Sequence, residues 1–353
     1  MENSINIDNE KLVKEFGAKR ISQIKNLPKF YTFDKGLIYS HRDFDKFLDR
    51  LKKGEKSAIV SGVNASGTLH LGHKVVFDTN LFFQREYNIP VFIPISDDES
   101  FVAGKVQTQE QAKEYALELA KEMLAYGFDP EKTFFIIDNI YTNIYNLAFK
   151  MSKKINYSEI KATYGYSPQT NIGLHFYPAV QAAHVLYPQE ILKIKNVLVP
   201  IGPDEDAHLR IARDIAQRLN IPKPSVLHLR FIEGLDRKKA SKSKNNTIFL
   251  KDTEKQIIKK CNSAFSGGQD TIELHKKLGG NPDIDMACQY LKNYYYNKEQ
   301  TKELFEKYKK GELLSRDIKR LLSQEIIKEL KLFQGNIKKV NPKVLDKCIL
   351  KNS

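Results

Sequence analysis

Cysteine is scarce in this sequence, with three residues in 353 positions, Cys261, Cys288 and Cys348, and no Cys-x-x-Cys pair. This scarcity excludes a disulfide scaffold and indicates buried or inert thiols in a reducing cytoplasm. No stretch approaches the roughly 18 uninterrupted apolar residues of a transmembrane helix, so we expect no membrane partner. The first 20 residues lack an apolar core after a basic head, so we also expect no secretory signal and a cytoplasmic location.

The composition is that of a globular chain with an excess of positive charge. Hydrophobic residues make up 41% and charged residues 28%, enough for a sizeable core in two or three domains. Lys and Arg outnumber Asp and Glu by 57 to 43, a net charge of +14. Residues 251–353 hold 22 basic and 14 acidic residues, so +8 of this excess lies there. The charge predicts a polyanionic partner without saying which one.

Short apolar runs alternate with helical patterns over the first 250 residues. One helical pattern, 108–126, opens with Thr108 three residues before Gln111, a capping box, and another covers 203–219. This alternation predicts an α/β fold with a doubly wound parallel sheet covered by helices on both faces, and ligands beyond the carboxyl ends of its strands. The apolar runs are 57–63, 90–95, 133–138, 196–202 and 225–232.

Strand signals fade after residue 252, and 286–332 is almost continuously helical in pattern. We therefore expect an all-helical C-terminal domain. The domains predicted from sequence are a mostly helical extension over 1–50, a catalytic α/β domain over 51–252 with a connecting insertion around 100–195, and the helical domain over 253–353.

The stretch SGVNASGTLHLGHKVVFD, residues 61–78, is the strongest local motif. A strand is expected to end at Gly62 and a helix to begin near Leu69, and a helix N-terminus attracts phosphate. His70 and His73 can donate hydrogen bonds there, while Gly72 leaves room for a flat base. The stretch alone also fits a structural turn with two surface histidines. A metal pair is a further alternative, although no third ligand pattern accompanies it.

The stretch GLDRKKASKSKNN, residues 234–246, follows the last apolar run. A loop of this kind can close ammonium groups over a triphosphate, but it can equally be a solvated basic run or a localisation patch. By itself it decides nothing. Its basic residues are Arg237, Lys238, Lys239, Lys242 and Lys244.

Together, HLGH and KASKS resemble the HIGH and KMSKS motifs of class I aminoacyl-tRNA synthetases, in the same order and on the same elements. The resemblance narrows to archaeal and eukaryotic tryptophanyl-tRNA synthetases and covers nearly the whole chain from about residue 10. It implies a Rossmann-like catalytic domain. Four further stretches carry it: AFSGGQDTIELHKKLGGNPDIDMACQYL (264–291), IGPDEDAHLRIARD (201–214), YPAVQAA (177–183) and GLIYSHRDFD (36–45).

The resemblance also implies roles for residues that match the family's motifs. It assigns catalysis to His70, His73, Lys239 and Lys242, and it implies no protein-bound metal. The amino acid would be held by Glu99 and Gln181, with Glu205 near the indole, although acids in a first helical turn are favourable without any ligand. The residues implied to bind ATP are Gly62, His70, Gly72, His73, Asp204, Lys239, Ser241 and Lys242.

Several positions depart from the family. Ala240 replaces the usual Met of KMSKS, and Glu205 stands where many tryptophanyl enzymes have glutamine. Val60 and Pro94 occupy positions where eukaryotic enzymes carry tyrosine and glutamine, so those indole contacts do not transfer. The sister family, the tyrosyl-tRNA synthetases, holds its phenol with a tyrosine and an aspartate that match Val60 and His184. Neither residue can play the same role, which favours tryptophan.

The function implied by the resemblance is a tryptophan–tRNA ligase. Such an enzyme joins L-tryptophan to ATP, with Mg²⁺, and transfers it to tRNA(Trp), without a DNA partner. We expect a homodimer with its interface in 140–195, and the basic C-terminal domain would bind the tRNA anticodon arm. The alternatives are a tyrosyl-tRNA synthetase, a non-catalytic tRNA-binding paralogue, and a small nucleotidylyltransferase. The long basic C-terminus and the second lysine loop disfavour the last.

Overall fold

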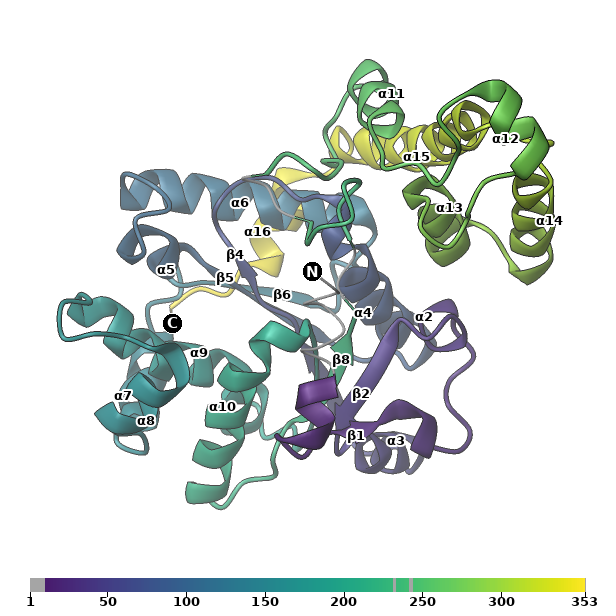
Figure 1. The fold of residues 1–353 in the computed structure, drawn as a ribbon. Helices are drawn as coiled ribbons and strands as arrows, with labels where there is room; N and C mark the ends of the chain where they lie inside the picture. The colour runs from purple at the N-terminus through teal and green to yellow at the C-terminus, as the bar shows by residue number, and fades with distance from the viewer. Residues whose placement is uncertain (1–9, 231–232, 241–243, 353) are drawn as a thin grey trace. The chain divides into compact units, whose positions relative to one another are not determined.

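The computed structural model describes residues 10–230, 233–240 and 244–352, and the chain forms two compact units. The first unit holds residues 1–68, 75–230 and 339–353. The second holds residues 69–74 and 231–338. The backbone therefore passes from one unit to the other four times, and both chain termini belong to the first unit (Figure 1).

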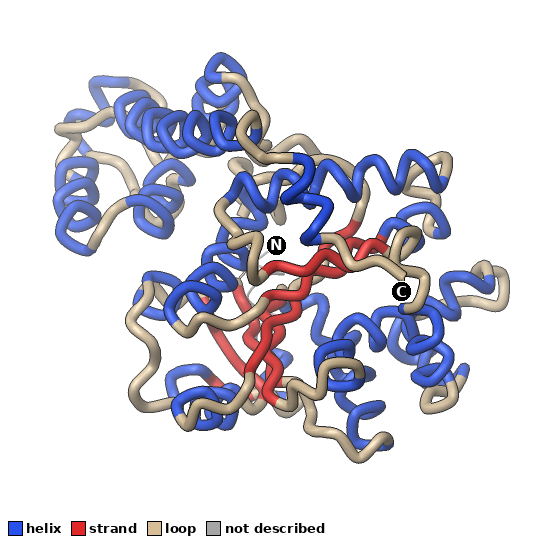
Figure 2. The backbone as a smooth tube through the Cα atoms, turned by 180° about the vertical axis from the view of Figure 1, so that it is seen from behind, coloured by secondary structure: helices blue, strands red, loops and turns tan. Residues whose placement is uncertain are grey.

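The first unit is built on one sheet with helices on both sides (Figure 2). In space the strands follow the order β1–β2–β8–β7–β3–β5–β6, and β4 pairs with the far end of β5 beyond β3. The strand pairs between β8 and β6 are parallel, whereas β2 pairs antiparallel with both β8 and β1. The strands are β1 (Lys19–Arg20), β2 (Ile38–Arg42), β3 (Ser57–Val60), β4 (Val63–Asn64), β5 (Val91–Ser96), β6 (Thr133–Ile137), β7 (Asn196–Ile201) and β8 (Ser225–Leu229).

The helices of the first unit fill the connections between these strands. Each of the five apolar runs in the sequence contains one parallel strand, and the doubly wound parallel sheet is confirmed. The helices are α2 (Tyr31–Asp34), α3 (Phe44–Lys52), α4 (Lys74–Glu86), α5 (Asp97–Val102), α6 (Gln109–Tyr126), α7 (Ile144–Ser152), α8 (Tyr157–Tyr164), α9 (Ile172–Glu190), α10 (Asp206–Arg218) and α16 (Pro342–Cys348), with 3-10 turns η1 (Ile21–Gln23) and η3 (Pro203–Glu205).

Helix α6 shows how local sequence sets the boundaries of an element. Its N-cap Thr108 accepts a hydrogen bond from the Gln111 backbone N–H, while the Gln111 side chain accepts from Gln107. At the other end Gly127 has φ of 118°, a left-handed conformation that costs glycine little. The helix expected over 108–126 is confirmed to within one residue.

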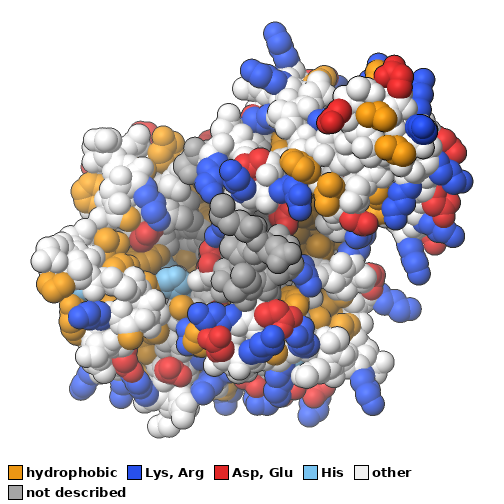
Figure 3. Space-filling view, in the orientation of Figure 1, with side chains coloured by type: hydrophobic (Ala, Val, Ile, Leu, Met, Phe, Trp, Pro, Cys, Tyr) orange, Lys and Arg blue, Asp and Glu red, His pale blue; other side chains and the backbone are white. Residues whose placement is uncertain are grey.

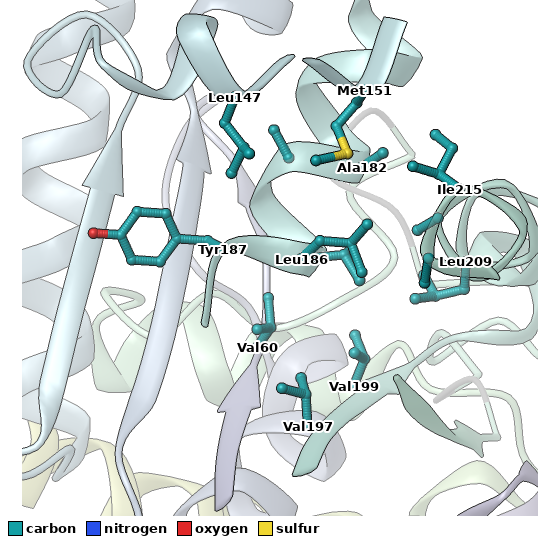
Figure 4. Packing of buried hydrophobic residues seen from close by; sticks show 14 of the residues in the cluster. Val60, Leu147, Met151, Ala182, Leu186, Tyr187, Val197, Val199, Leu209 and Ile215 are labelled. Carbon is teal, nitrogen blue, oxygen red and sulfur yellow. The ribbon is translucent and has the colours of Figure 1, made fainter. Parts of the chain in front are cut away.

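Side-chain alternation along the central strands divides the core into two layers. Val60, Val197 and Val199 point to one face, where α9 packs through Ala182 and Leu186 (Figure 4). Residues from α7 and α10, among them Met151, Leu209 and Ile215, cover α9 in the same cluster. The opposite face carries an aromatic cluster of Phe33, Phe44, Phe47 and Phe83. Both faces of the central strands are therefore buried, which explains their continuous apolar runs.

Described residues 10–50 differ from the mostly helical extension expected from sequence over residues 1–50. They contribute β1 and β2, and β2 extends the sheet by pairing antiparallel with β8. Residues 38–42 read IYSHR, a short run with three polar residues whose pairing depends on the distant β8. Tertiary pairing therefore decides this strand.

The second unit is helical, as expected for the C-terminal part. The chain returns to the first unit after residue 338, and Ile349 bridges in parallel to Phe135 at the edge of β6. Among the described residues, no helix has the length and apolar character needed to cross a membrane. The helices of the second unit are η2 (Leu71–His73), α11 (Glu254–Asn262), α12 (Ile272–Leu278), α13 (Met286–Tyr290), the π-helical turn η4 (Leu291–Tyr295), α14 (Lys298–Lys309) and α15 (Ser315–Ile337).

Candidate active site

A pocket of about 280 Å³ opens at the carboxyl ends of β3, β5 and β7 in the first unit. Strands β3 and β7 are neighbours, and the chain winds outward from them in opposite directions, so this is the topological switch point of the sheet. Ligands of doubly wound folds bind at such points. The lining residues are Val60, Gly62, Val63, Asn64, Pro94, Ser96, Glu99, Lys105, Tyr164, Tyr166, Tyr177, Gln181, His184, Val185, Val199, Ile201, Glu205, His208 and Leu209.

One part of the pocket is polar and charged. The Lys105 ammonium lies 2.9 Å from both carboxylate oxygens of Glu99, which also accepts a hydrogen bond from the Asn64 amide. Gln181, on α9, accepts a hydrogen bond of 3.2 Å from the Tyr164 hydroxyl. Charged and amide groups of this kind suit the ammonium and carboxylate of a free amino acid. The structure therefore brings Glu99 and Gln181 into one pocket.

The remaining walls are apolar and aromatic. The Tyr164 and Tyr166 rings stack with centroids 5.2 Å apart, and the His208 ring lies 4.7 Å from Tyr164. Val60 and Pro94 face the same space. Flat rings and branched aliphatic side chains favour an aromatic ligand, because they bury apolar area against its faces.

His184 is a buried polar residue of the pocket. It is 3% exposed, and its Nε2 lies 2.6 Å from Asp138 Oδ1. Burial lowers the pKa of His184 to about 4, so the ring is neutral at pH 7. Burial raises the pKa of Asp98 and of Asp138, and the Tyr145 hydroxyl donates to Asp98. With Asp138 Oδ1 as the acceptor of His184 Nε2–H, the neutral ring keeps Nδ1 as a hydrogen-bond acceptor.

The HLGH segment forms the short turn η2 in the second unit. His70 Nδ1 accepts a hydrogen bond of 3.0 Å from the Gly72 backbone N–H. The backbone N–H of His70 in turn donates to His73 Nδ1 at 3.2 Å. A Cβ on Gly72 would lie 2.5 Å from the His70 ring, so glycine is what lets this ring fold back over the turn. The two histidines, with ring centroids 4.2 Å apart, are therefore held by the turn itself.

The HLGH segment and the end of the KASKS loop lie side by side in the second unit. The Leu71 N–H donates to the Ile248 carbonyl at 2.9 Å, and the Leu250 N–H donates to the Leu69 carbonyl at 3.0 Å. Lys239 is exposed on the loop, and its carbonyl accepts from the Asn246 amide at 3.1 Å. The HLGH motif thus shares one small antiparallel contact with residues 248–250, which follow the KASKS loop.

The other predicted residues fall in different places. Gly62 and Glu205 line the pocket, but Asp204 does not, although it lies on η3 close enough to raise the pKa of His208 against the larger lowering effect of burial. Ser241 and Lys242 lie outside the described residues. Their assignments stay predictions.

Residues 52–331 match the family described as tRNA synthetases class I (W and Y). This chain belongs to that family. A tryptophan–tRNA ligase of Methanocaldococcus jannaschii is 38% identical over 96% of this chain and 95% of that protein. A cytoplasmic one of Saccharomyces cerevisiae is 35% identical over 98% of this chain and 84% of that protein. A crystal structure of Plasmodium falciparum tryptophanyl-tRNA synthetase has a TM-score of 0.86 at 32% identity, covering 96% of this chain and 94% of that chain.

Membership confirms the Rossmann-like fold and makes the chain an aminoacyl-tRNA ligase, a class of enzyme that uses ATP as a substrate. The class I resemblance did not by itself assign Lys105, Tyr164 or the Asp98–Asp138 pair to the site. One signal was available for Asp138, since it ends the apolar run TFFIID and so falls at the carboxyl edge of the sheet.

Proposed function

We propose that this class I synthetase is a tryptophan–tRNA ligase. The observation that carries the proposal is the pocket at the switch point, in which aromatic and aliphatic walls surround the neutral ring of His184. An indole ring is flat and apolar and has a single N–H donor, which matches both features. Lys105 and Glu99, which form an ion pair, would lie near the carboxylate and the ammonium group of the amino acid.

In the first step, the tryptophan carboxylate attacks the α-phosphate of ATP, forming tryptophanyl-adenylate and releasing pyrophosphate. A carboxylate is already a nucleophile at neutral pH, so catalysis depends on alignment and on stabilising negative charge at the phosphates. We assign that stabilisation to His70, His73, Lys239 and Lys242. Gly62, Gly72, Asp204 and Ser241 complete the proposed ATP site.

Mg²⁺ would enter this reaction with the phosphates of ATP. Within the described residues, Asp97, Asp98 and Asp138 place carboxylate oxygens within 4.8 Å of one another. These groups suit a resident cation poorly, because burial raises the pKa of all three carboxyl groups and Asp97 accepts two hydrogen bonds from Asn139. The acidic group therefore serves His184.

In the second step, the 2′-hydroxyl of the terminal tRNA adenosine attacks the carbonyl of the adenylate and AMP leaves. We propose a homodimer with its interface in residues 140–195, where Phe149 and Ile172 are 66% and 83% exposed. The helical domain at 253–338, with Lys and Arg in excess, would bind the anticodon arm of tRNA(Trp). We also propose a cytoplasmic location, because the yeast relative is named as a cytoplasmic enzyme.

ATP–pyrophosphate exchange measured with each of the twenty amino acids tests the proposed function. We expect stimulation by L-tryptophan well above that by tyrosine or phenylalanine. Stimulation by tyrosine alone would overturn the choice of substrate, and no stimulation would favour the non-catalytic paralogue.

The neutral His184 predicts how tryptophan is recognised. Because Nδ1 accepts the indole N–H, the enzyme should discriminate against benzothienylalanine, in which sulfur replaces that N–H. We expect kcat/KM to favour tryptophan by on the order of 10²-fold, since the analogue leaves a buried polar atom unpaired. The variant His184→Leu should reduce this preference to about threefold or less.

The matched comparison is His184→Gln, which keeps a hydrogen-bond acceptor on a side chain of similar reach. It should retain much of the preference for tryptophan over benzothienylalanine. If His184→Leu kept the full preference while activating tryptophan normally, another residue would be the acceptor.

A further inference from the structure

A second cavity in the first unit, of about 430 Å³, shares no lining residue with the active-site pocket. It is formed by β1, η1, the end of β2 and α3, all within the N-terminal region. Its walls are strongly polar. The lining residues are Lys19, Gln23, Ile24, Lys25, His41, Asp45, Leu48, Asp49 and Lys52.

His41 brings an unsatisfied donor to this cavity. The side chain is 1% exposed, and its Nδ1 accepts a hydrogen bond of 3.2 Å from the Phe44 backbone N–H, so the proton sits on Nε2. In the described structure, that Nε2 is buried and has no hydrogen-bond partner. Burial lowers the pKa of His41 to about 4, which keeps the ring neutral. A buried N–H of this kind is costly unless a ligand accepts from it.

Asp45 supplies an acceptor four residues further along. Its Oδ1 is likewise buried without a hydrogen-bond partner in the part of the chain that the structure describes. The carboxylate is close enough to His41 to oppose, in part, the lowering of the histidine pKa. The cavity therefore offers one donor and one acceptor as neighbours, and a hydroxyl group satisfies both, because it accepts one hydrogen bond and donates another.

Lysines outnumber aspartates around the cavity by three to two, the acids being Asp45 and Asp49. Lys19, which pairs with His41 across the β1–β2 ladder, Lys25 and Lys52 are exposed, and among the described residues no ion pair engages them. Residues 10–56 hold 13 Lys and Arg against 7 Asp and Glu. Figure 3 shows Lys and Arg side chains, interspersed with Asp and Glu, along the lower border of the first unit, where Figure 1 places β1 and α3. A ligand for this cavity therefore carries negative charge beside a hydroxyl.

We propose that this cavity binds the ribose–phosphate backbone of RNA. A ribose 2′-hydroxyl accepts from His41 Nε2–H and donates to Asp45 Oδ1, while the adjacent phosphates lie against Lys19, Lys25 and Lys52. DNA lacks this hydroxyl and leaves both buried atoms unpaired. The inference rests on the proposed function only for the presence of an RNA partner, and it adds a contact to RNA on the N-terminal part of the catalytic unit.

The role of the lysines around the cavity is tested with the double variant Lys25→Glu/Lys52→Glu in the full-length protein. Binding to a tRNA(Trp) transcript, measured by filter binding over a salt series, should weaken about tenfold or more, and the slope of log K against log salt should fall by about 2. The control Lys113→Glu/Lys223→Glu makes the same charge change at exposed sites outside the cavity and should cost less than about threefold. Equal losses in the two double variants would overturn the proposal.

The hydroxyl contact is tested with a short RNA and the DNA oligonucleotide of the same sequence. Asp45→Ala should lower the RNA-over-DNA preference of the protein by about 3- to 10-fold, whereas Asp45→Asn, which keeps an acceptor oxygen, should preserve most of it. An unchanged preference in a folded Asp45→Ala protein would contradict the proposal. Tryptophan-dependent pyrophosphate exchange without RNA should be normal in all these variants, and its absence from the wild type would refute the proposed function instead.

Discussion

Replacement of His73 by alanine is expected to lower the rate of tryptophan activation by on the order of 10²–10³, with little change in tryptophan affinity. In the proposed reaction, the imidazole stabilises negative charge that develops on the ATP phosphates in the transition state. Hydrogen bonds to charged groups contribute about 1.5–3 kcal/mol each, and removing a charge-stabilising donor in an active site costs somewhat more. Pyrophosphate exchange measures the rate.

His73 also accepts a hydrogen bond from the His70 N–H, so the alanine variant loosens the turn as well as removing the catalytic group. The variant His73→Asn separates these effects, since its side-chain oxygen can still accept from His70 but does not reproduce the imidazole Nε2. We expect the asparagine variant to be as slow as the alanine variant. Because the chain contains no tryptophan, fluorescence of the bound substrate reports affinity directly. Near-normal exchange by either variant would contradict the assignment.

Replacement of Asp206 by alanine is expected to lower the free energy of unfolding by about 3–5 kcal/mol. Asp206 is 1% exposed at the start of α10, where Arg42 from β2 donates to it at 2.7 and 2.8 Å. His228 from β8 donates to the same carboxylate at 2.9 Å. Removing the carboxylate leaves a guanidinium that is only 10% exposed without its counter-charge. Chemical denaturation measures the loss.

The same carboxylate predicts a dependence of stability on pH. Burial alone would raise the pKa of Asp206. The hydrogen bonds from His228 and Arg42 have the larger combined effect, and they hold this pKa well below its usual range. A lowered pKa in the folded state adds stability at neutral pH, and that stability is lost as pH falls below about 4. The alanine variant should therefore show a smaller loss of stability on acidification than the wild type does.

Asp214→Ala is the matched control for Asp206→Ala, because Asp214 lies exposed on the same helix. We expect this control to change the free energy of unfolding by less than about 0.5 kcal/mol. A loss below about 1 kcal/mol in Asp206→Ala would show that the Arg42–Asp206–His228 network is not what joins α10 to the sheet.

The parts of the fold that the sequence predicts well are those with local causes. Buried parallel strands must be apolar on both faces, so the runs around Ile59, Ile93 and Leu198 stand out. Helix α6 carries its own cap and its terminal glycine. Strand β2 lacks such a signal, because its hydrogen bonds go to β8, almost 190 residues away.

Some residues of the candidate site can likewise be predicted from local sequence, and others only from the structure. HLGH, KASKS and Gln181 belong to contiguous motifs, whereas Glu99 follows only from the resemblance to the family. The pair Asp98 and Asp138 becomes meaningful only when β5 and β6 lie in register, bringing the residues that follow both strands to one edge. In the sequence, nothing near His184 distinguishes it from a histidine of the core. Its contact with Asp138, which orients the ring in the pocket, is visible only in the structure.

Because the chain passes between the two units four times, a single truncation cannot separate them. Strand β6 receives its last neighbour from the extreme C-terminus, where Leu350 N–H donates to Phe135 O and the Asn352 amide donates to Thr142. Simple truncation after residue 230 would remove the helical domain together with this part of the catalytic unit. A fragment that keeps the first unit should instead join residue 230 to residue 339 through a short flexible linker, so that it keeps both of its native ends. This fragment would lack Lys239 and Lys242, so it should fold without supporting tryptophan activation.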